Sequence, residues 1–400
     1  MSTTTPSTTG VQRRKPKLAI NLRQYGILAA LAIIIILFQI MTDGRLLLSG
    51  NVNNLIQQNA YVLILAIGMV MVIIAGHIDL SVGSVVAMVG AVAAISMNTW
   101  GLPWWAAVIV SLIVGALVGA WQGFWVAFVG IPAFIVTLAG MLIFRGLTLV
   151  LLTGGTISGL PDEFTAIGAG WIPAYLGEIA GRDLLTLALG VLTALALIVQ
   201  MLRSRATLRR LDLPREPIAT LYIKGGVAAV AIIWFAWLLS DYSGTPIILI
   251  VLAVLILAYT FLLNQTVFGR HIYAMGGNLF AAMMSGVKTK WVNFFIFVNM
   301  GVLAGLAGVV STARAGGAVA SAGQNYELDA IAAVFIGGAA VTGGVGTVIG
   351  AVIGGLVMGV LNMGLSILSV DAAWQMTIKG LVLLLAVAFD IFNKRRAGGR

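Results

Sequence analysis

Apolar runs of bilayer length constrain this sequence more than any other feature. At least ten runs are long enough to cross a membrane as a helix, which takes about 20 apolar residues. Only 9% of the residues are charged, against 60% hydrophobic. The sequence therefore predicts an all-α, polytopic transmembrane bundle of about 10–12 spans. We place the spans near residues 25–41, 58–76, 80–98, 104–128, 132–152, 184–202, 225–239, 246–264, 291–313, 328–342, 346–369 and 373–392.

The domain organisation follows from these runs. A polar, basic segment covers residues 1–24, and residues 25–400 form a single transmembrane domain. The first apolar run has no small-residue cleavage site and leads into further spans, so we expect an anchor and not a removed signal peptide. Two connecting loops stand out, a basic loop at 203–224 and a half-apolar loop at 265–290.

The distribution of cations predicts the orientation. Of the 23 lysines and arginines, 18 lie in segments 13–23, 203–224, 270–290 and 394–400, which an even number of spans places on one side. Cations gather in cytoplasmic loops, so both termini are expected in the cytoplasm. The net charge of +10 then reflects topology. Since the cations form no groove with interleaved aromatic residues, we expect no nucleic-acid partner.

The loop at 265–290 contains a predicted short helix. Asn278 can cap its N-terminus, residues 279–285 form it, and Gly286 can end it. Its apolar stripe consists of Leu279, Ala282, Met283 and Gly286, extended by Phe280 and Met284. Two turns are not stable alone in water, so the helix must pack on lipid or on a partner. A helix on the membrane surface is rich in Lys and Arg, and this one has none, which favours a cytoplasmic protein partner.

Several reaction classes lack the residues they need. The sequence has no GxxxxGK[ST] phosphate loop and no cysteine, and its two histidines, His77 and His271, lie in different loops. We therefore expect no catalytic residue, no metal site and no bound cofactor. A proton- or sodium-coupled transporter needs buried carboxylates in a relay, and few are present, although this class stays open as an alternative. Any energy from ATP must then arrive through contact with another polypeptide.

Two apolar segments are interrupted by glycines in a similar way, at 75–86 and 337–349. Broken helices expose backbone donors and acceptors, which suits a polar path for a neutral, hydroxyl-rich substrate. The predicted pathway groups are His77, Asp79, Ser81, Ser84, Arg145 and Thr347. The alternative for Asp79 is a helix cap on the backbone of Ser81 or Val82, and we rank this alternative slightly ahead.

Two cations interrupt predicted spans, Arg145 and Lys379. A charge inside a bilayer is costly and must find a partner or reach the surface. For Arg145 we predict pairing inside the bundle with one of the acids nearest to a span, Asp79, Glu327 or Asp329. For Lys379, near the end of its span, we predict that the side chain extends to the outer headgroups.

Motifs spread over the whole chain carry a family resemblance. They are TDGRLLLSGNVNNLIQQNA at 42–60, GMVMVIIAGHIDLSVGS at 68–84, IPAFIVTLAGMLIFRG at 131–146, FGRHIYAMGGNLFAAMMSG at 268–286 and ELDAIAAVFIGGAAVTGGVGTVIGAVIGG at 327–355. Together they resemble the permease subunits of bacterial ATP-binding cassette importers of the ribose, xylose and galactoside class. The insertion at 203–245 resembles the xylose branch. The sequence departs from the family pattern at His77, Phe280 and Met283–Met284, and the family often has an acidic residue at position 280.

The resemblance implies an importer of a monosaccharide, with D-xylose first and ribose, galactose, arabinose or several sugars as alternatives. It implies a multi-pass inner-membrane homodimer surrounded by lipid, with a periplasmic sugar-binding protein and separate ATP-binding subunits that hold ATP and magnesium. It also implies coupling to those subunits through Gly269, Arg270, Asn278, Leu279, Phe280, Ala281, Ala282, Met283 and Gly286. The segment 153–183 is either a landing surface for the binding protein or a solvated loop.

Overall fold

The computed structural model describes residues 22–211, 213 and 217–398. The predicted basic segment 1–24 lies outside these residues except for its last three, and so do residues 212 and 214–216 of the loop at 203–224. The helices are α1 (Leu22–Met41), α2 (Ser49–Ile74), α3 (Val82–Asn98), α4 (Trp104–Phe124), the π-helix η1 (Trp125–Val129), α5 (Ala133–Leu152), α6 (Asp162–Ala169), α7 (Leu184–Arg210), α8 (Ile218–Ser240), α9 (Ile247–Gln265), α10 (Val267–Gly277), α11 (Leu279–Met284), α12 (Thr289–Ala315), α13 (Tyr326–Ile336), α14 (Val348–Ile367) and α15 (Ala372–Gly398).

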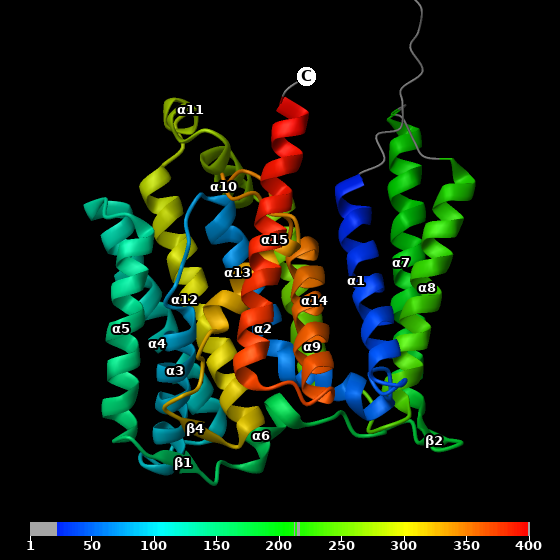
Figure 1. The fold of residues 1–400 in the computed structure, drawn as a ribbon, viewed down its shortest axis with the longest axis horizontal. Helices are drawn as coiled ribbons and strands as arrows, with labels where there is room; N and C mark the ends of the chain where they lie inside the picture. Colours follow the sequence, from blue (N-terminus) through cyan, green and yellow to red (C-terminus); the bar gives the residue numbers. More distant parts are fainter. Residues whose placement is uncertain (1–21, 212, 214–216, 399–400) are drawn as a thin grey trace, which may run out of the picture.

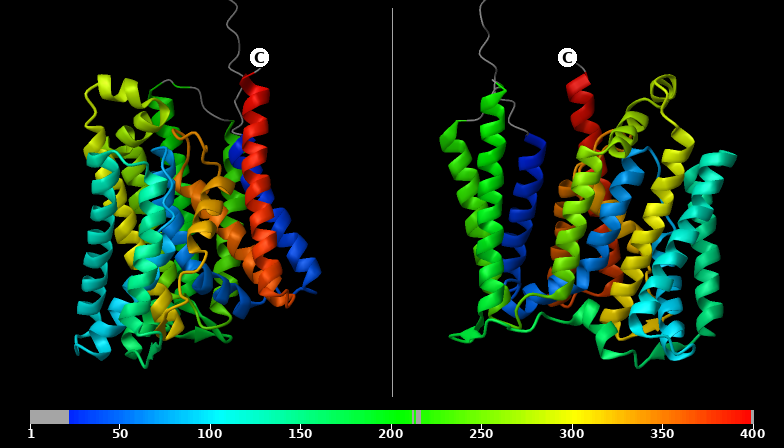
Figure 2. Two further views of the ribbon diagram at one scale, coloured as in Figure 1. Left: turned by 60° about the vertical axis from the view of Figure 1, so that its left-hand side comes forward. Right: turned by 180° about the vertical axis from the view of Figure 1, so that it is seen from behind.

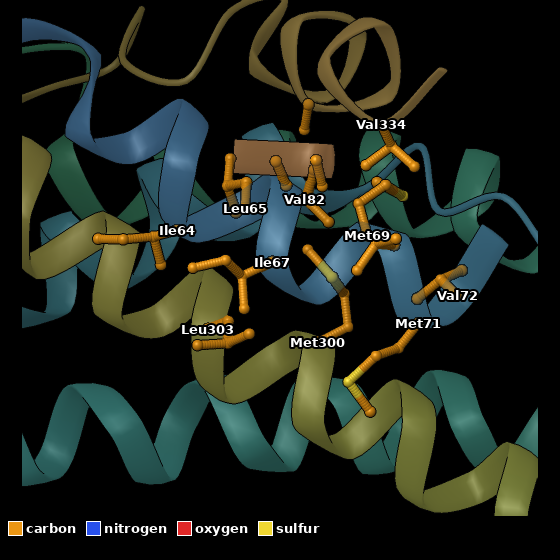
Figure 3. Close-up of a cluster of buried hydrophobic side chains, with 14 of the residues drawn as sticks. Ile64, Leu65, Ile67, Met69, Met71, Val72, Val82, Met300, Leu303 and Val334 are labelled. Atoms are coloured by element: carbon orange, nitrogen blue, oxygen red, sulfur yellow. The ribbon is translucent and has the colours of Figure 1, made fainter. Parts of the chain in front are cut away.

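Helix α2 forms the centre of the bundle. Its side chains Ile64, Leu65 and Ile67 are fully buried in the main hydrophobic cluster, where Ile67 lies beside Met300 and Leu303 of α12 and Leu65 lies toward Val82 of α3 (Figure 3). Helix α12 in turn crosses α4 at very short range, because a Cβ atom on Gly115 would overlap the carbonyl oxygen of Gly301. Small residues at a crossing let two backbones approach where lipid gives no hydrophobic drive for association.

Most of the predicted spans are confirmed as helices. Eight of the described helices are long and apolar enough to cross a membrane: α2, α4 with η1, α5, α7, α8, α9, α12 and α14. Shorter apolar stretches occupy α1, α3 and α15. The protein is therefore a polytopic helical membrane protein. Its helices pack in one bundle around α2, with α7 and α8 forming a peripheral pair on the side of α1 (Figures 1 and 2).

Four predicted spans differ from the structure. Helix α7 continues past residue 202 to Arg210, and α8 begins at Ile218 and not near residue 225, so most of the predicted loop 203–224 is helical. The segment 328–342 is not a span, because α13 covers only Tyr326–Ile336 and irregular backbone follows it to residue 347. A helix of 11 residues is about 16 Å long, against a hydrocarbon core of about 30 Å. Helix α2 starts at Ser49 and not near residue 58. Its polar first turns escaped prediction because Asn53 and Gln57 are buried inside protein and do not face lipid.

The interrupted segments produce two short helices inside the bundle. An extended segment at 75–81 descends from the end of α2 to α3, and a second irregular segment at 320–325 leads from the opposite end to α13 (Figures 1 and 2). The N-terminal ends of the two helices meet, since a Cβ atom on Gly83 would overlap the carbonyl oxygen of Gly323 and a carboxylate oxygen of Glu327. The interruption predicted at 75–86 is thus confirmed, whereas the segment before α13 was not foreseen.

The two ends of the bundle carry different structures. Helices α10 and α11 lie at the end where α1 begins and α15 ends (Figure 1). The other end carries α6 and two small antiparallel pairs, β1 (Thr156–Ser158) with β4 (Gly317–Val319) and β2 (Glu178–Ile179) with β3 (Arg182–Asp183). The pairing of β1 with β4 joins the loop at 153–183 to the chain that leads into α13.

Candidate functional site: the α10–α11 loop and a polar cavity

The predicted short helix is confirmed as α11. The Asn278 side-chain oxygen accepts a hydrogen bond from the Ala281 backbone N–H at 2.9 Å, which caps the helix. Gly286 follows the last turn with φ +83°, a left-handed conformation that glycine adopts without strain. A second helix precedes it in the same loop, α10, capped by Thr266 through the Gly269 N–H at 3.2 Å. Helix α10 was not predicted from the sequence.

The exposed surface of α11 is apolar. Phe280 and Met284 are 70% and 69% exposed, and Leu279 and Met283 are about half exposed. Ala282 is 5% exposed and faces the protein, so the predicted stripe is corrected at this position. The other residues predicted for coupling divide in the same way: Gly269 is buried against the end of α9, whereas Arg270, Asn278, Ala281 and Gly286 are exposed.

Helix α10 contacts the end of α2, where the segment 75–81 begins, and the irregular segment 337–347 between α13 and α14. The Gly344 N–H donates to the carbonyl oxygen of Ile74 at 2.8 Å, and Gly276 lies against both groups. The Tyr273 hydroxyl donates to the Gly346 carbonyl at 2.7 Å. Burial raises the pKa of the Tyr273 phenol, so the group stays neutral and remains a donor. A displacement of α10 would therefore reach the segment before α3 and the segment after α13 together.

Gly276 gives a test of this junction. A Cβ atom there would overlap the Ile74 carbonyl oxygen and lie 2.5 Å from the Gly344 nitrogen, and backbone atoms cannot rotate away. We expect Gly276→Ala to destabilise the protein by about 1–3 kcal/mol, as overpacking does. Thermal unfolding of the purified protein measures this. The neighbouring Gly277 has open space at its Cβ position, so Gly277→Ala is the matched control, and equal stabilities of the two variants would contradict the contact.

Two of the predicted pathway residues, Asp79 and Ser81, form polar contacts between the start of α3 and the last turn of α4. The Asp79 carboxylate accepts from the backbone N–H of Ser81 at 2.8 Å and from its hydroxyl at 2.6 Å. The Ser81 hydroxyl accepts from the Gln122 amide at 2.6 Å. Asp79 is 2% exposed and Ser81 is fully buried, which supports the capping interpretation of Asp79. Ser84, one turn further, is buried, and its hydroxyl has no hydrogen-bond partner among the described residues.

His77 and Thr347 also have local partners. His77 Nε2 lies 3.0 Å from the Asn293 side-chain oxygen, which connects the extended segment to the N-terminal part of α12. The Thr347 hydroxyl accepts from the Gly350 N–H at 3.0 Å and caps α14. The structure thus distributes the six predicted pathway residues over several places and does not gather them around one cavity.

The hydrogen-bond partners of Arg145 differ from the prediction, although Arg145 also interacts electrostatically with Glu327, one of the three predicted acids. Its guanidinium donates to two backbone carbonyls, of Ala320 at 3.1 Å and of Ala322 at 2.6 Å, and not to a carboxylate. The physical reason is the irregular segment at 320–325, in which the Ala320 and Ala322 carbonyls lie outside any helix. Inside a membrane such groups must be satisfied by the protein, and an arginine fork can bond two of them.

The prediction for Lys379 is wrong. Its ammonium lies 3.2 Å from an Asp329 carboxylate oxygen, where it forms an ion pair between α15 and α13. The Lys379 and Asp329 side chains are 24% and 4% exposed. The other oxygen of Asp329 accepts from the Tyr61 hydroxyl at 3.1 Å, so α2 joins the same contact. The lysine stays in the bundle because α13 is a short helix whose first turn places Asp329 at the depth of Lys379.

A polar cavity of about 310 Å³ opens next to this ion pair. Helices α2, α12, α13, α14 and α15 line it, and none of the six predicted pathway residues is among its lining residues. The lining residues are Gln57, Gln58, Asn59, Tyr61, Val310, Ser311, Arg314, Ala315, Tyr326, Asn362, Ser366, Gln375 and Lys379. The sequence offered one signal for it. The run Gln57–Gln58–Asn59 is polar on consecutive positions, and it lies within α2 and not before it.

Comparison with curated proteins gives close relatives over nearly the whole chain. The chain is 42% identical to the xylose transport system permease protein of Haemophilus influenzae over 378 residues, which cover 94% of this chain and 98% of the relative. It is 41% identical to the protein of the same description in Escherichia coli K12 over 380 residues, 95% of this chain and 94% of the relative. The E. coli K12 ribose import permease protein is 32% identical over 351 residues, 87% of each chain.

The family comparison agrees with these relatives, and no solved structure matches the chain significantly. Residues 51–387 match the family described as the permease component of the branched-chain amino acid transport system. This match begins in the first turn of α2 and ends within α15, so it includes both interrupted segments, the α10–α11 loop and the polar cavity. The chain belongs to this family of transport-system permease components.

Proposed function

We propose that this protein is the permease subunit of an ATP-binding cassette importer that moves a monosaccharide, D-xylose, from the periplasm to the cytoplasm by alternating access. The observation that carries the proposal is the identity of 41–42% over nearly the full length of xylose transport permeases. The identity to a ribose import permease is 32%, which makes ribose the second candidate. The substrate is taken from these relatives and not from a residue in the chain.

The partners follow from the same proposal. Separate ATP-binding subunits hold ATP and magnesium and dock on the exposed apolar surface of α11. Two copies of the permease form the membrane unit in the bacterial inner membrane, and the end that carries α10 and α11 faces the cytoplasm. A periplasmic sugar-binding protein delivers the substrate at the other end. There Tyr175, which precedes β2, and Ile179 within β2 are 77% and 63% exposed. ATP hydrolysis belongs to the partner, so this chain is a transport subunit and not an enzyme.

Reconstitution tests the proposal. The permease is co-expressed with a candidate ATP-binding subunit and placed in liposomes with the sugar-binding protein of the same organism. We expect a stable complex, and accumulation of radiolabelled xylose that requires both ATP and the binding protein. Ribose serves as the comparison substrate. Uptake that follows an imposed proton or sodium gradient without ATP, or a permease that never associates with an ATPase, would contradict the proposal.

A further inference from the structure

The polar cavity lies in the half of the bundle away from α10 and α11. Its lining residues come from the last turns of α12 and α14, from the first turns of α15 and from the first half of α2. All four of these helix ends lie at the end that carries β1 to β4 (Figure 1). The cavity therefore belongs to the side opposite the α10–α11 loop.

The inner wall of the cavity is an aromatic pair. Tyr61 of α2 and Tyr326 of α13 stack with their ring centroids 3.5 Å apart and their planes 16° from parallel. Tyr61 lies four residues deeper along α2 than Gln57, a rise of about 6 Å. The Tyr326 hydroxyl lies 3.3 Å from the Ser311 hydroxyl of α12, and the Tyr61 hydroxyl bonds Asp329. Each tyrosine hydroxyl therefore has a polar contact outside the pair, and each ring covers one face of the other.

The rest of the lining offers neutral hydrogen-bonding groups and one cation. Gln58, Ser366 and Arg314 are exposed to the cavity, and no described residue forms a hydrogen bond or ion pair with their side chains. The buried Asn362 side-chain oxygen also has no partner among the residues that the structure describes. Lys379 is neutralised by Asp329, so Arg314 is the lining cation without a counter-charge in the described part of the chain.

We infer that this cavity is the site where the sugar is held on its way through the membrane, with Gln58, Arg314 and Ser366 as contacts. The inference rests on the proposed function and names residues for it. A monosaccharide presents hydroxyl groups on adjacent carbons, and a planar guanidinium can donate two parallel hydrogen bonds to such a pair. Amide and serine groups supply both donors and acceptors. The volume of about 310 Å³ is at the lower end of the range of about 300–1,000 Å³ for small-molecule sites.

Cysteine labelling tests the location, because the natural chain contains no cysteine. In the reconstituted complex, we expect Ser366→Cys to react with a charged, membrane-impermeant thiol reagent added on the binding-protein side. Xylose at about ten times its Kd for this site should slow the labelling by about tenfold, because only permease molecules without bound sugar react. Ser111→Cys is the matched buried control and should not react, since Ser111 is 0% exposed. Ser204→Cys, exposed near the α10–α11 end of α7, should react only from the other side and without sugar protection.

Substitutions test the chemistry. Arg314→Leu and Gln58→Leu should each lower xylose uptake by about tenfold, the effect of losing one strong hydrogen bond to the substrate. ATP hydrolysis stimulated by the binding protein should stay within about twofold of the unmodified complex in both variants. The rate of ATP hydrolysis distinguishes a loss of sugar contacts from a loss of assembly. Normal uptake by both variants, or labelling of Ser366→Cys that sugar does not slow, would overturn the inference while the importer still works. A complex in which the unmodified permease imports no sugar would instead overturn the proposed function.

A charged derivative of the sugar tests whether the site prefers an anion to a neutral sugar. Arg314 would also attract a carboxylate, so xylonate is tested as a competitor beside xylose. We expect xylose to protect Ser366→Cys and xylonate at the same concentration to protect it less, because the amide and hydroxyl groups recognise neutral hydroxyls. Stronger protection by xylonate would show that the site selects an anion and would reject the assignment to a neutral sugar.

Discussion

Lys379→Met should lower the free energy of unfolding by about 3 kcal/mol. Removing one partner of a buried ion pair leaves the other charge uncompensated, which costs about 3–5 kcal/mol. Asp329 is 4% exposed, and among the described residues its carboxylate would keep only the Tyr61 hydroxyl as a side-chain hydrogen-bond partner. We take the lower end of the range because the carboxyl group can bind a proton and because Lys379 is partly exposed. Thermal unfolding of the purified protein in detergent measures the change.

The double variant is the control for this expectation. Lys379→Met combined with Asp329→Asn removes both charges and keeps an oxygen that can accept from Tyr61. Well-packed neutral groups can replace a buried ion pair with little loss, so the double variant should recover most of the stability. If the double variant were as unstable as the sum of the two single variants, the side chains would act independently and the ion pair between α13 and α15 would not be the cause.

Local signals predicted the parts of this fold that depend on neighbouring residues. Asn278 and Gly286 bracket α11 as the sequence indicated, because a cap and a left-handed stop act within one turn. Asp79 caps through Ser81 for the same reason. Long apolar runs predicted most spans directly, since their composition alone satisfies the lipid environment.

Contacts between distant segments were not predictable in this way. Asp329 and Lys379 are far apart in sequence, and they meet only because α13 is a short helix that begins inside the bundle. Arg145 bonds Ala320 and Ala322 because their segment is irregular, and an apolar window cannot distinguish such a segment from a loop. The polar cavity combines five helices, so no local pattern could identify it beyond the run at 57–59.

The sequence also could not predict which side of α11 packs against the protein. Helical spacing places Ala282 on the same stripe as Leu279 and Met283, but a stripe on so short a helix can turn inward or outward. The structure turns Ala282 inward and leaves Phe280 and Met284 outside. A charge at Ala282 would therefore disturb the loop itself, whatever partner it binds. Phe280 and Met284 are the positions at which the docking proposal can be tested without that ambiguity.

Met284→Asp should prevent assembly with the ATP-binding subunits and abolish uptake. Met284 is 69% exposed and lies outside the candidate spans, so the substitution leaves folding and membrane insertion intact. In a docked complex the carboxylate would be buried without a partner, which costs several kcal/mol and weakens binding by at least about a hundredfold. Co-purification with the ATP-binding subunit measures assembly, and Phe280→Asp should behave in the same way.

Two further variants of the same surface test whether α11 contacts a protein partner or lipid. Phe280→Leu keeps an apolar side chain and should retain assembly and most of the uptake, because a protein pocket tolerates a smaller apolar group better than a charge. Met284→Lys decides between the two surfaces. If α11 lay on anionic headgroups, the added cation would be neutral or favourable, by about 1 kcal/mol. If α11 fills an apolar pocket of the ATP-binding subunit, the ammonium is buried unpaired and assembly fails as with Asp. Normal assembly of Met284→Lys together with normal uptake would place α11 on the membrane surface, and the contact that transmits the energy of ATP hydrolysis would then have to lie elsewhere on the loop.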